Sequence, residues 1–408
     1  MGQTKSTMEH TIPATASAAR YEAVIPSSRQ AAALASTRLL FIDNLRWVMI
    51  MLVVSMHAAV TYSGHGSWYT KESARLGLPQ EMTFVTYQVF LQSFFMGLLF
   101  FVAGYFVPGA VDKKGPARFL RDRALRLGVP ALLFMLVIQP LTLYYAAGLW
   151  DTDQGFFHQY ERYIAHGRFL SGTGPLWFCV ALLFFSSWYA AWRAVSTTRS
   201  IKPRPFPPAA TVAAFIALIA LATFLIRIPW PNGTSFYNMQ FCYFPQYIFF
   251  FIAGTLSYRN SWLSTLSKNT SRSWGRIGLI GGLTIWILLI IFGDARKTTA
   301  TFDGGWHWQS LGMSLMESLA GTGISIGLLG LFREKYNRQG KLAVFFSASA
   351  FAVYVFHTPI LIVITRVITG LHWLPLLKFL LATLLAIVVT YALAAWVFRK
   401  IPLLKNIL

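Results

Sequence analysis

Charged residues are scarce in this sequence. Only 12% of its 408 residues are Asp, Glu, Lys or Arg, whereas 55% are hydrophobic and 16% are aromatic. A water-soluble domain carries about 25% charged residues to cover its surface. Acidic residues are the scarcer kind, with 14 of them against 35 Lys and Arg, which gives a formal net charge of +21. The composition excludes an ordinary soluble domain and indicates lipid as the solvent for most of the chain.

Cysteine is also nearly absent. Cys179 and Cys242 are the two in the chain, and each lies inside an apolar stretch. Two such residues exclude a disulfide framework, and neither has the spacing of a C-x-x-C or zinc-ligand motif. We expect two buried thiols that pack like small apolar side chains, and no metal site.

The Lys and Arg residues do not form a nucleic-acid-binding pattern. They fall in short runs between apolar stretches, without interleaved aromatic residues or a recognition motif. Nucleic acid is therefore not an expected partner, and the lipid bilayer is.

Apolar stretches of the ~20 residues needed to cross a bilayer recur along the chain. Residues 1–40 contain none and are rich in Ala, Ser and Thr, which predicts a disordered cytoplasmic tail. Residues 41–400 are the predicted membrane domain, an all-α polytopic fold of about ten transmembrane helices. The predicted spans lie near 41–63, 84–106, 127–149, 174–192, 207–226, 240–258, 277–293, 308–332, 343–365 and 374–398.

The distribution of basic residues predicts the topology. With ten spans and the N-terminus inside, 25 of the 35 Lys and Arg fall on the cytoplasmic side and 9 on the other, while Arg46 lies within the first span. The excess recurs at every alternate loop, as the positive-inside rule requires. We therefore expect cytoplasmic N- and C-termini in a multi-pass protein of the cell membrane. Aromatic residues cluster at the predicted outer boundaries, as an interfacial belt does: Trp68, Tyr69, Trp150, Trp230, Trp306 and Trp308.

Two polar residues of the first span share one helix face. Arg46 and His57 are separated by about three helical turns, or about 16 Å along the axis, and so point to the same side. Asp43 lies one turn before Arg46, where the two can pair. An ionisable residue inside a span indicates a functional site by default. The alternative is an interfacial ion pair and a histidine that only packs.

Two further spans carry ionisable residues. Glu317 must be protonated, paired with a basic residue, or in contact with a water-filled cavity, because a charged carboxylate has a high free energy in lipid. A glutamate near His57 would orient the imidazole of a general base. His357 precedes Pro359, so it can instead donate to a backbone carbonyl at the kink.

The loop after the second span is rich in arginine. Arg118, Arg121, Arg123 and Arg126 recur near one predicted membrane surface. The guanidinium fork suits phosphate groups. These residues therefore either bind a phosphorylated cofactor or provide ordinary positive-inside charge in contact with lipid head groups.

These residues, in this order, resemble the acyltransferase 3 family of membrane proteins, and most nearly its glucan biosynthesis protein C-like branch. Residues 41–57 resemble the family's Arg-x10-His signature, with Arg46 and His57 at its ends. Residues 100–106 resemble the family's Phe-Phe-x-x-Ser-Gly-Phe element, with Ala103 in place of Ser, and Arg123-Ala-Leu-Arg126 resembles its Arg-x-x-Arg motif. Residues 174–178 resemble its Leu-Trp-Phe element, with Pro175 at a position where His is frequent. Residues 349–359 resemble its closing motif. The match covers roughly residues 38–400.

The resemblance implies an O-acyltransferase that takes an acyl group from cytoplasmic acyl-CoA, such as acetyl-CoA or succinyl-CoA. The acceptor would be a hydroxyl on a carbohydrate or a lipid-linked molecule, as in O-acetylation. His57 would be the general base, with Arg46 and Glu317 in the catalytic set and the arginine loop holding the CoA phosphates. Tyr105, Trp177 and His357 would contact the substrate.

Two alternatives come from other functional classes. A proton-coupled secondary transporter could use Arg46, His57 and Glu317 as a proton relay. Such folds tend to show internal repeats, and the two halves of this sequence show no convincing one. A non-catalytic protein with the same fold is the other alternative.

Overall fold

The computed structural model describes residues 39–72, 76–196, 204–294 and 299–402. These residues form helices and loops, and none of them belongs to a β-strand, which confirms the predicted all-α class. The predicted tail 1–40 lies, except for its last two residues, outside the described part of the chain.

Nine helices in the described residues are long and apolar enough to cross a membrane. Helix α10 holds the place of the predicted sixth span but has 17 residues, or about 25 Å of helix. The first long elements are α2 (Leu40–Ser63), α3 (Leu78–Lys114) and a continuous helix that runs from Pro116 to Ala146 through α4 (Pro116–Arg123), η1, α5 (Val129–Leu133), η2, α6 (Gln139–Leu141) and η3. They are followed by α8 (Trp177–Val195), α9 (Ala209–Arg227), α10 (Phe244–Asn260), and α12 (Lys268–Arg276) continued by η8 (Ile277–Gly281) and α13 (Gly282–Phe292). The last are α15 (Trp308–Lys335), α16 (Lys341–Val367) and α17 (Pro375–Trp396). The shorter α7, α11 and α14 span Phe156–Ala165, Trp262–Thr265 and Ala300–Asp303.

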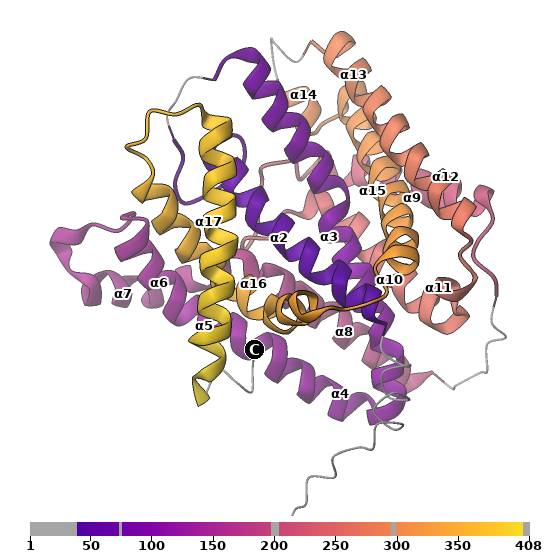
Figure 1. Cartoon of the computed structure of the whole chain (residues 1–408), viewed down its shortest axis with the longest axis horizontal. Helices are drawn as coiled ribbons and strands as arrows, with labels where there is room; N and C mark the ends of the chain where they lie inside the picture. Colours follow the sequence, from indigo (N-terminus) through magenta and orange to yellow (C-terminus); the bar gives the residue numbers. More distant parts are fainter. Residues whose placement is uncertain (1–38, 73–75, 197–203, 295–298, 403–408) are drawn as a thin grey trace, which may run out of the picture. The chain divides into compact units, whose positions relative to one another are not determined.

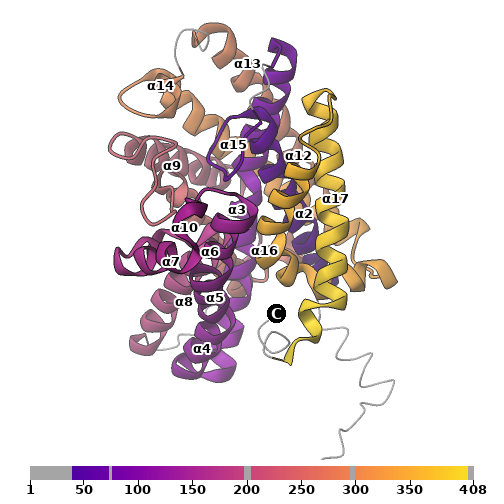
Figure 2. The same ribbon diagram turned by 90° about the vertical axis from the view of Figure 1, so that its left-hand side faces the viewer.

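Helices α2 and α3 lie at the centre of this arrangement. Helices α16 and α17 pack against α2, whereas α10 and α15 pack against α3. Figure 1 shows α9, α12, α13 and α15 on one side of α3 and α17 on the other, and Figure 2 shows α4, α5, α6 and α8 from a second direction. Five helices, α2, α3, α4, α8 and α16, thereby come to surround one region.

Small residues allow the closest helix contacts. A Cβ added at Gly254 of α10 would collide with the Phe101 carbonyl oxygen of α3. On α15, Gly323 faces Gly278 of η8, where an added Cβ would meet the opposing Cα. Close backbone approach through small residues is the usual way in which membrane helices associate without a hydrophobic driving force.

Basic residues gather at one end of the helices, which we call the basic end. Arg259 near the end of α10 bonds Asp112 near the end of α3 at 3.0 Å, and Arg193 near the end of α8 lies 3.4 Å from the same carboxylate. The start of α2 is held there too, because Asn44 donates to the carbonyl oxygens of Tyr336 and Arg338, at 2.7 and 2.8 Å. The arrangement matches the predicted clustering of basic loops, and which compartment this end faces stays a prediction.

Three π-helical segments interrupt the helix that runs from α4 to η3: η1 (Ala124–Gly128), η2 (Phe134–Ile138) and η3 (Thr142–Ala146). Pro140 lacks an N–H and leaves carbonyls in the preceding turn without their helical donor. Two tyrosines of α7 provide donors instead: Tyr163 bonds the Met135 oxygen at 2.8 Å, and Tyr160 bonds the Leu136 oxygen at 3.1 Å. Helix α7 is thereby fixed to the middle of this span.

Candidate active site

A cavity of about 360 Å³ opens at the basic end between α2, α3, α4, η1, α8 and α16. Its lining divides into charged residues and an apolar wall. The lining residues are Arg46, Ile50, Leu99, Val102, Ala103, Phe106, Ala110, Lys114, Phe119, Asp122, Arg123, Arg126, Leu127, Phe178, Cys179, Leu182, Ala350, Phe351 and Tyr354. A mostly apolar hollow with a few convergent polar groups is the usual form of a small-molecule site.

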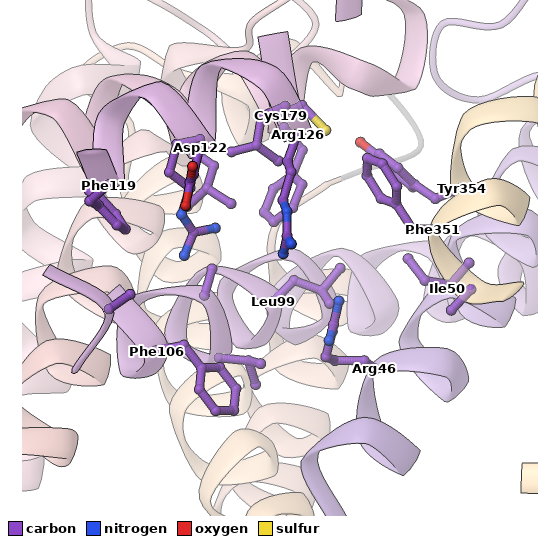
Figure 3. Close-up of a pocket in the computed structure, with 18 of the residues that line it drawn as sticks. Arg46, Ile50, Leu99, Phe106, Phe119, Asp122, Arg126, Cys179, Phe351 and Tyr354 are labelled. Atoms are coloured by element: carbon purple, nitrogen blue, oxygen red, sulfur yellow. The ribbon is translucent and has the colours of Figure 1, made fainter. Parts of the chain in front are cut away.

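Four basic side chains line the charged part. Arg46 comes from α2 and Lys114 from the end of α3, whereas Arg123 and Arg126 come from α4 and η1. The arginine-rich segment that the sequence placed in a loop is therefore helical. Figure 3 shows Arg46 and Arg126 reaching toward each other across the cavity. Asp122 also lies here and pairs with Lys114, so the lining keeps an excess of positive charge.

The first-span residues occupy the positions that helix geometry predicted. The Arg46 side chain is half-exposed and lies 3.7 Å from Asp43, which confirms the expected pairing. Ile50, one turn further along α2, also lines the cavity. His57 lies two more turns along, on the side of α2 that faces α16.

The apolar wall includes Tyr354 of α16, which is buried. Its hydroxyl donates to the carbonyl oxygen of Pro175, in the short turn that starts α8. Gly174 in this turn has a left-handed φ of +49°, and a Cβ there would collide with Phe134, so no larger side chain fits. Tyr354 thus connects the cavity to the predicted Leu-Trp-Phe element.

One turn beyond Tyr354, His357 meets His57. The two imidazole rings have centroids 5.4 Å apart and planes inclined by 17°. His357 is fully buried, and its Nδ1 lies 2.8 Å from the Tyr354 carbonyl oxygen. The expected contact of His357 with a backbone carbonyl is therefore present, and it coexists with a position beside His57.

Trp68 covers His57 from the loop between α2 and α3. The indole and imidazole centroids are 4.1 Å apart, with planes inclined by 16°. The sequence placed Trp68 in an interfacial belt, but its indole nitrogen is buried. No sequence signal reports this contact, because it depends on how the loop folds back over α2.

Two side-chain bonds hold this loop. Tyr69 donates to Gln139 at 2.6 Å, and burial raises the pKa of Tyr69 and keeps the hydroxyl protonated. Glu72 accepts from the buried Lys378 of α17 at 2.9 Å. Lys378 lies within the tenth predicted span, and its ammonium group is paired inside the protein.

Glu317 does not lie with His57. Its carboxylate is 2.7 Å from the guanidinium of Arg227 at the end of α9, and both side chains are buried. Arg227 also lies over the ring of Tyr243, with 5.5 Å to the ring centroid. The sequence did not single out Arg227, because it directly follows the predicted fifth span, where a basic residue is expected in a loop.

The other predicted site residues lie outside the cavity lining. Arg118 and Arg121 are exposed on α4. Tyr105 packs against Tyr258 of α10, with 5.5 Å between ring centroids. Trp177 packs against Tyr247 at 5.6 Å, and its neighbour Phe178 reaches the cavity instead. Lys114 and Asp122 are cavity residues that the sequence did not single out.

A model of a protein family described as an acyltransferase domain matches residues 39–395. No curated protein and no solved structure matches the chain. The match covers all the helices that surround the cavity and both histidines.

Proposed function

The chain belongs to the acyltransferase 3 family, and from this premise we propose that it moves an acyl group from acyl-CoA to a hydroxyl group of an acceptor. The observation that carries the proposal is the cavity at the basic end, where Arg46, Arg123 and Arg126 converge above an apolar wall. Guanidinium groups bind phosphates in a bidentate manner, and an apolar wall suits an uncharged chain.

Acyl-CoA has the matching distribution of charge. Its phosphates would bind at the arginines, and its pantetheine arm would follow the apolar wall toward Tyr354. The thioester would then come near His357 and His57, one turn beyond Tyr354. A cavity of about 360 Å³ suits an arm with a small acyl group, such as that of acetyl-CoA or succinyl-CoA.

His57 would act as the general base. The acceptor hydroxyl loses its proton to the imidazole as its oxygen attacks the thioester carbonyl, the carbon–sulfur bond breaks, and the proton passes to the leaving thiolate. We propose as acceptor a carbohydrate or a lipid-linked molecule, which would be O-acylated from the end of the bundle opposite the arginines. In this proposal the basic end and both termini would be cytoplasmic in a protein of the cell membrane, as the positive-inside rule predicts. A carbohydrate acceptor is the one expected of the glucan biosynthesis protein C-like branch.

No observation favours the transporter alternative. A relay requires Arg46, His57 and Glu317 to exchange protons through neighbouring groups. Arg46 lines the cavity at the basic end, His57 stacks with His357, and Glu317 is paired with Arg227.

The test is CoA release by the purified protein from acetyl-CoA and succinyl-CoA, with candidate sugars as acceptors. We expect turnover by the wild type and at least a hundredfold loss of kcat in His57→Ala, the usual scale of general-base catalysis. Flux of a solute across proteoliposomes without CoA release would contradict the proposal. Turnover of His57→Ala at the wild-type rate would remove His57 from its role.

A further inference from the structure

The imidazole ring of His57 lies beside that of His357, and the contacts of His357 show which of its two ring nitrogens carries the hydrogen. The Nδ1 atom of His357 lies 2.8 Å from the carbonyl oxygen of Tyr354. A carbonyl oxygen only accepts hydrogen bonds, so Nδ1 must carry the hydrogen. A neutral imidazole has one N–H, and Nε2 of His357 is then an unprotonated acceptor.

That acceptor has no hydrogen-bond partner. His357 is fully buried, and its Nε2 is among the buried polar atoms of the described chain that bond to nothing. Buried polar groups are nearly always hydrogen-bonded, so each exception calls for an explanation. An explanation is available if a donor arrives there during the reaction.

His57 can provide the donor. The ring centroids of the two histidines are 5.4 Å apart and their planes are inclined by 17°, and no hydrogen bond joins the two rings in this structure. A rotation that turns a nitrogen of each ring toward the other would bring these nitrogens to about 3 Å, which is hydrogen-bond distance. Catalytic hydrogen bonds are often incompletely aligned without substrate and tighten in the reacting complex. When His57 takes a proton it gains a second N–H, and His357 Nε2 is the buried acceptor beside it.

We infer that His357 is a positioning residue that accepts a hydrogen bond from protonated His57 and so stabilises the imidazolium during acyl transfer. This inference rests on the proposed function and deepens it. His357 thereby takes the part that an acidic residue has in a catalytic triad, and that the sequence assigned to Glu317. Its own protons do not move: the proton goes from the acceptor hydroxyl to His57 and then to the thiolate.

Two substitutions separate this role from a structural one. In His357→Asn the side-chain amide retains a donor for the Tyr354 carbonyl but removes the acceptor at the position of Nε2. In His357→Gln the amide oxygen reaches toward that position. We expect kcat to fall at least tenfold in His357→Asn with little change in the KM for acyl-CoA, and to be partly restored in His357→Gln. Equal wild-type kcat in both variants would overturn the inference.

A second measurement does not depend on activity. In protein labelled with ¹⁵N-histidine, the signals lost in His357→Asn belong to His357, and their shifts distinguish the Nδ1–H from the Nε2–H form. We expect Nδ1–H, and an Nε2–H signal would overturn the inference. If the wild type itself releases no CoA from any acyl-CoA, the proposed function fails, whereas a fully active His357→Asn contradicts only the role of His357.

Discussion

Arg227 and Glu317 form an ion pair that crosses from α9 to α15 and is buried on both sides, with 2.7 Å between the guanidinium nitrogen and the carboxylate oxygen. The Arg227 side chain is 1% exposed and that of Glu317 is 9% exposed. Such a pair contributes little net stability relative to apolar residues, but removal of one partner leaves an uncompensated buried charge.

We therefore expect Glu317→Ala to lower the free energy of unfolding by about 3–5 kcal/mol. The double variant Arg227→Met/Glu317→Met should recover most of this loss, because two apolar side chains of similar length replace both charges. Thermal unfolding in detergent micelles measures the stability of the single variant and of the double variant. Recovery of stability together with wild-type CoA release would show that Glu317 is structural, whereas a stable but inactive double variant would return it to the catalytic set.

The cavity arginines should control donor affinity. One charge-assisted hydrogen bond contributes about 1.5–3 kcal/mol, so Arg126→Ala should raise the KM for acyl-CoA about tenfold or more with a smaller effect on kcat. Arg276→Ala is the matched control, because Arg276 is exposed on α12 and does not line the cavity. Arg121→Ala should have a weaker effect than Arg126→Ala, since Arg121 is exposed on the same helix outside the cavity. Equal KM values for the wild type and Arg126→Ala would contradict donor binding at these residues.

The features that could be predicted depend on one helix or on composition. Helix geometry alone fixed the common face of Arg46 and His57, and the i to i+3 spacing fixed the Asp43–Arg46 pair. The lengths of the apolar stretches predicted where the spans lie, although α10, with 17 residues, is shorter than an ordinary membrane crossing. The motif Arg123-Ala-Leu-Arg126 identified two of the cavity arginines.

The features that could not be predicted depend on contacts between distant segments. Arg227 and Glu317 are 90 positions apart, and a single sequence holds no signal that joins them. The same holds for His57 and His357, each of which was singled out without the other. Which arginines of the loop reach the cavity depends on the π-helical segment η1, whose extra residue per turn rotates Arg126 relative to α4.

Trp68 should stabilise the protonated form of His57. An indole face attracts a cation with about 0.5–2 kcal/mol, more than a phenyl ring does, and the rings already stack at 4.1 Å. We expect kcat to decrease in the order wild type, Trp68→Phe, Trp68→Leu, with about a tenfold loss in the last. Equal losses in the two variants would mean that Trp68 only fills space.

The loop that carries Trp68 should depend on its buried ion pair. Lys378 is 2% exposed at its side chain and Glu72 is 18% exposed, with 2.8 Å between them. Removal of the Glu72 carboxylate leaves the more deeply buried charge, the Lys378 ammonium, without a partner. Glu72→Ala should therefore destabilise the protein by about 3–5 kcal/mol, and Lys378→Met by less. The exposed pair of His65 and Glu81 in the same region, at 47% and 39% exposure, provides the control, since His65→Ala should cost about 1 kcal/mol or less. Thermal unfolding in detergent micelles measures the stabilities of these three variants. A smaller loss of stability in Glu72→Ala than in His65→Ala would show that the ion pair of Glu72 and Lys378 does not hold the loop.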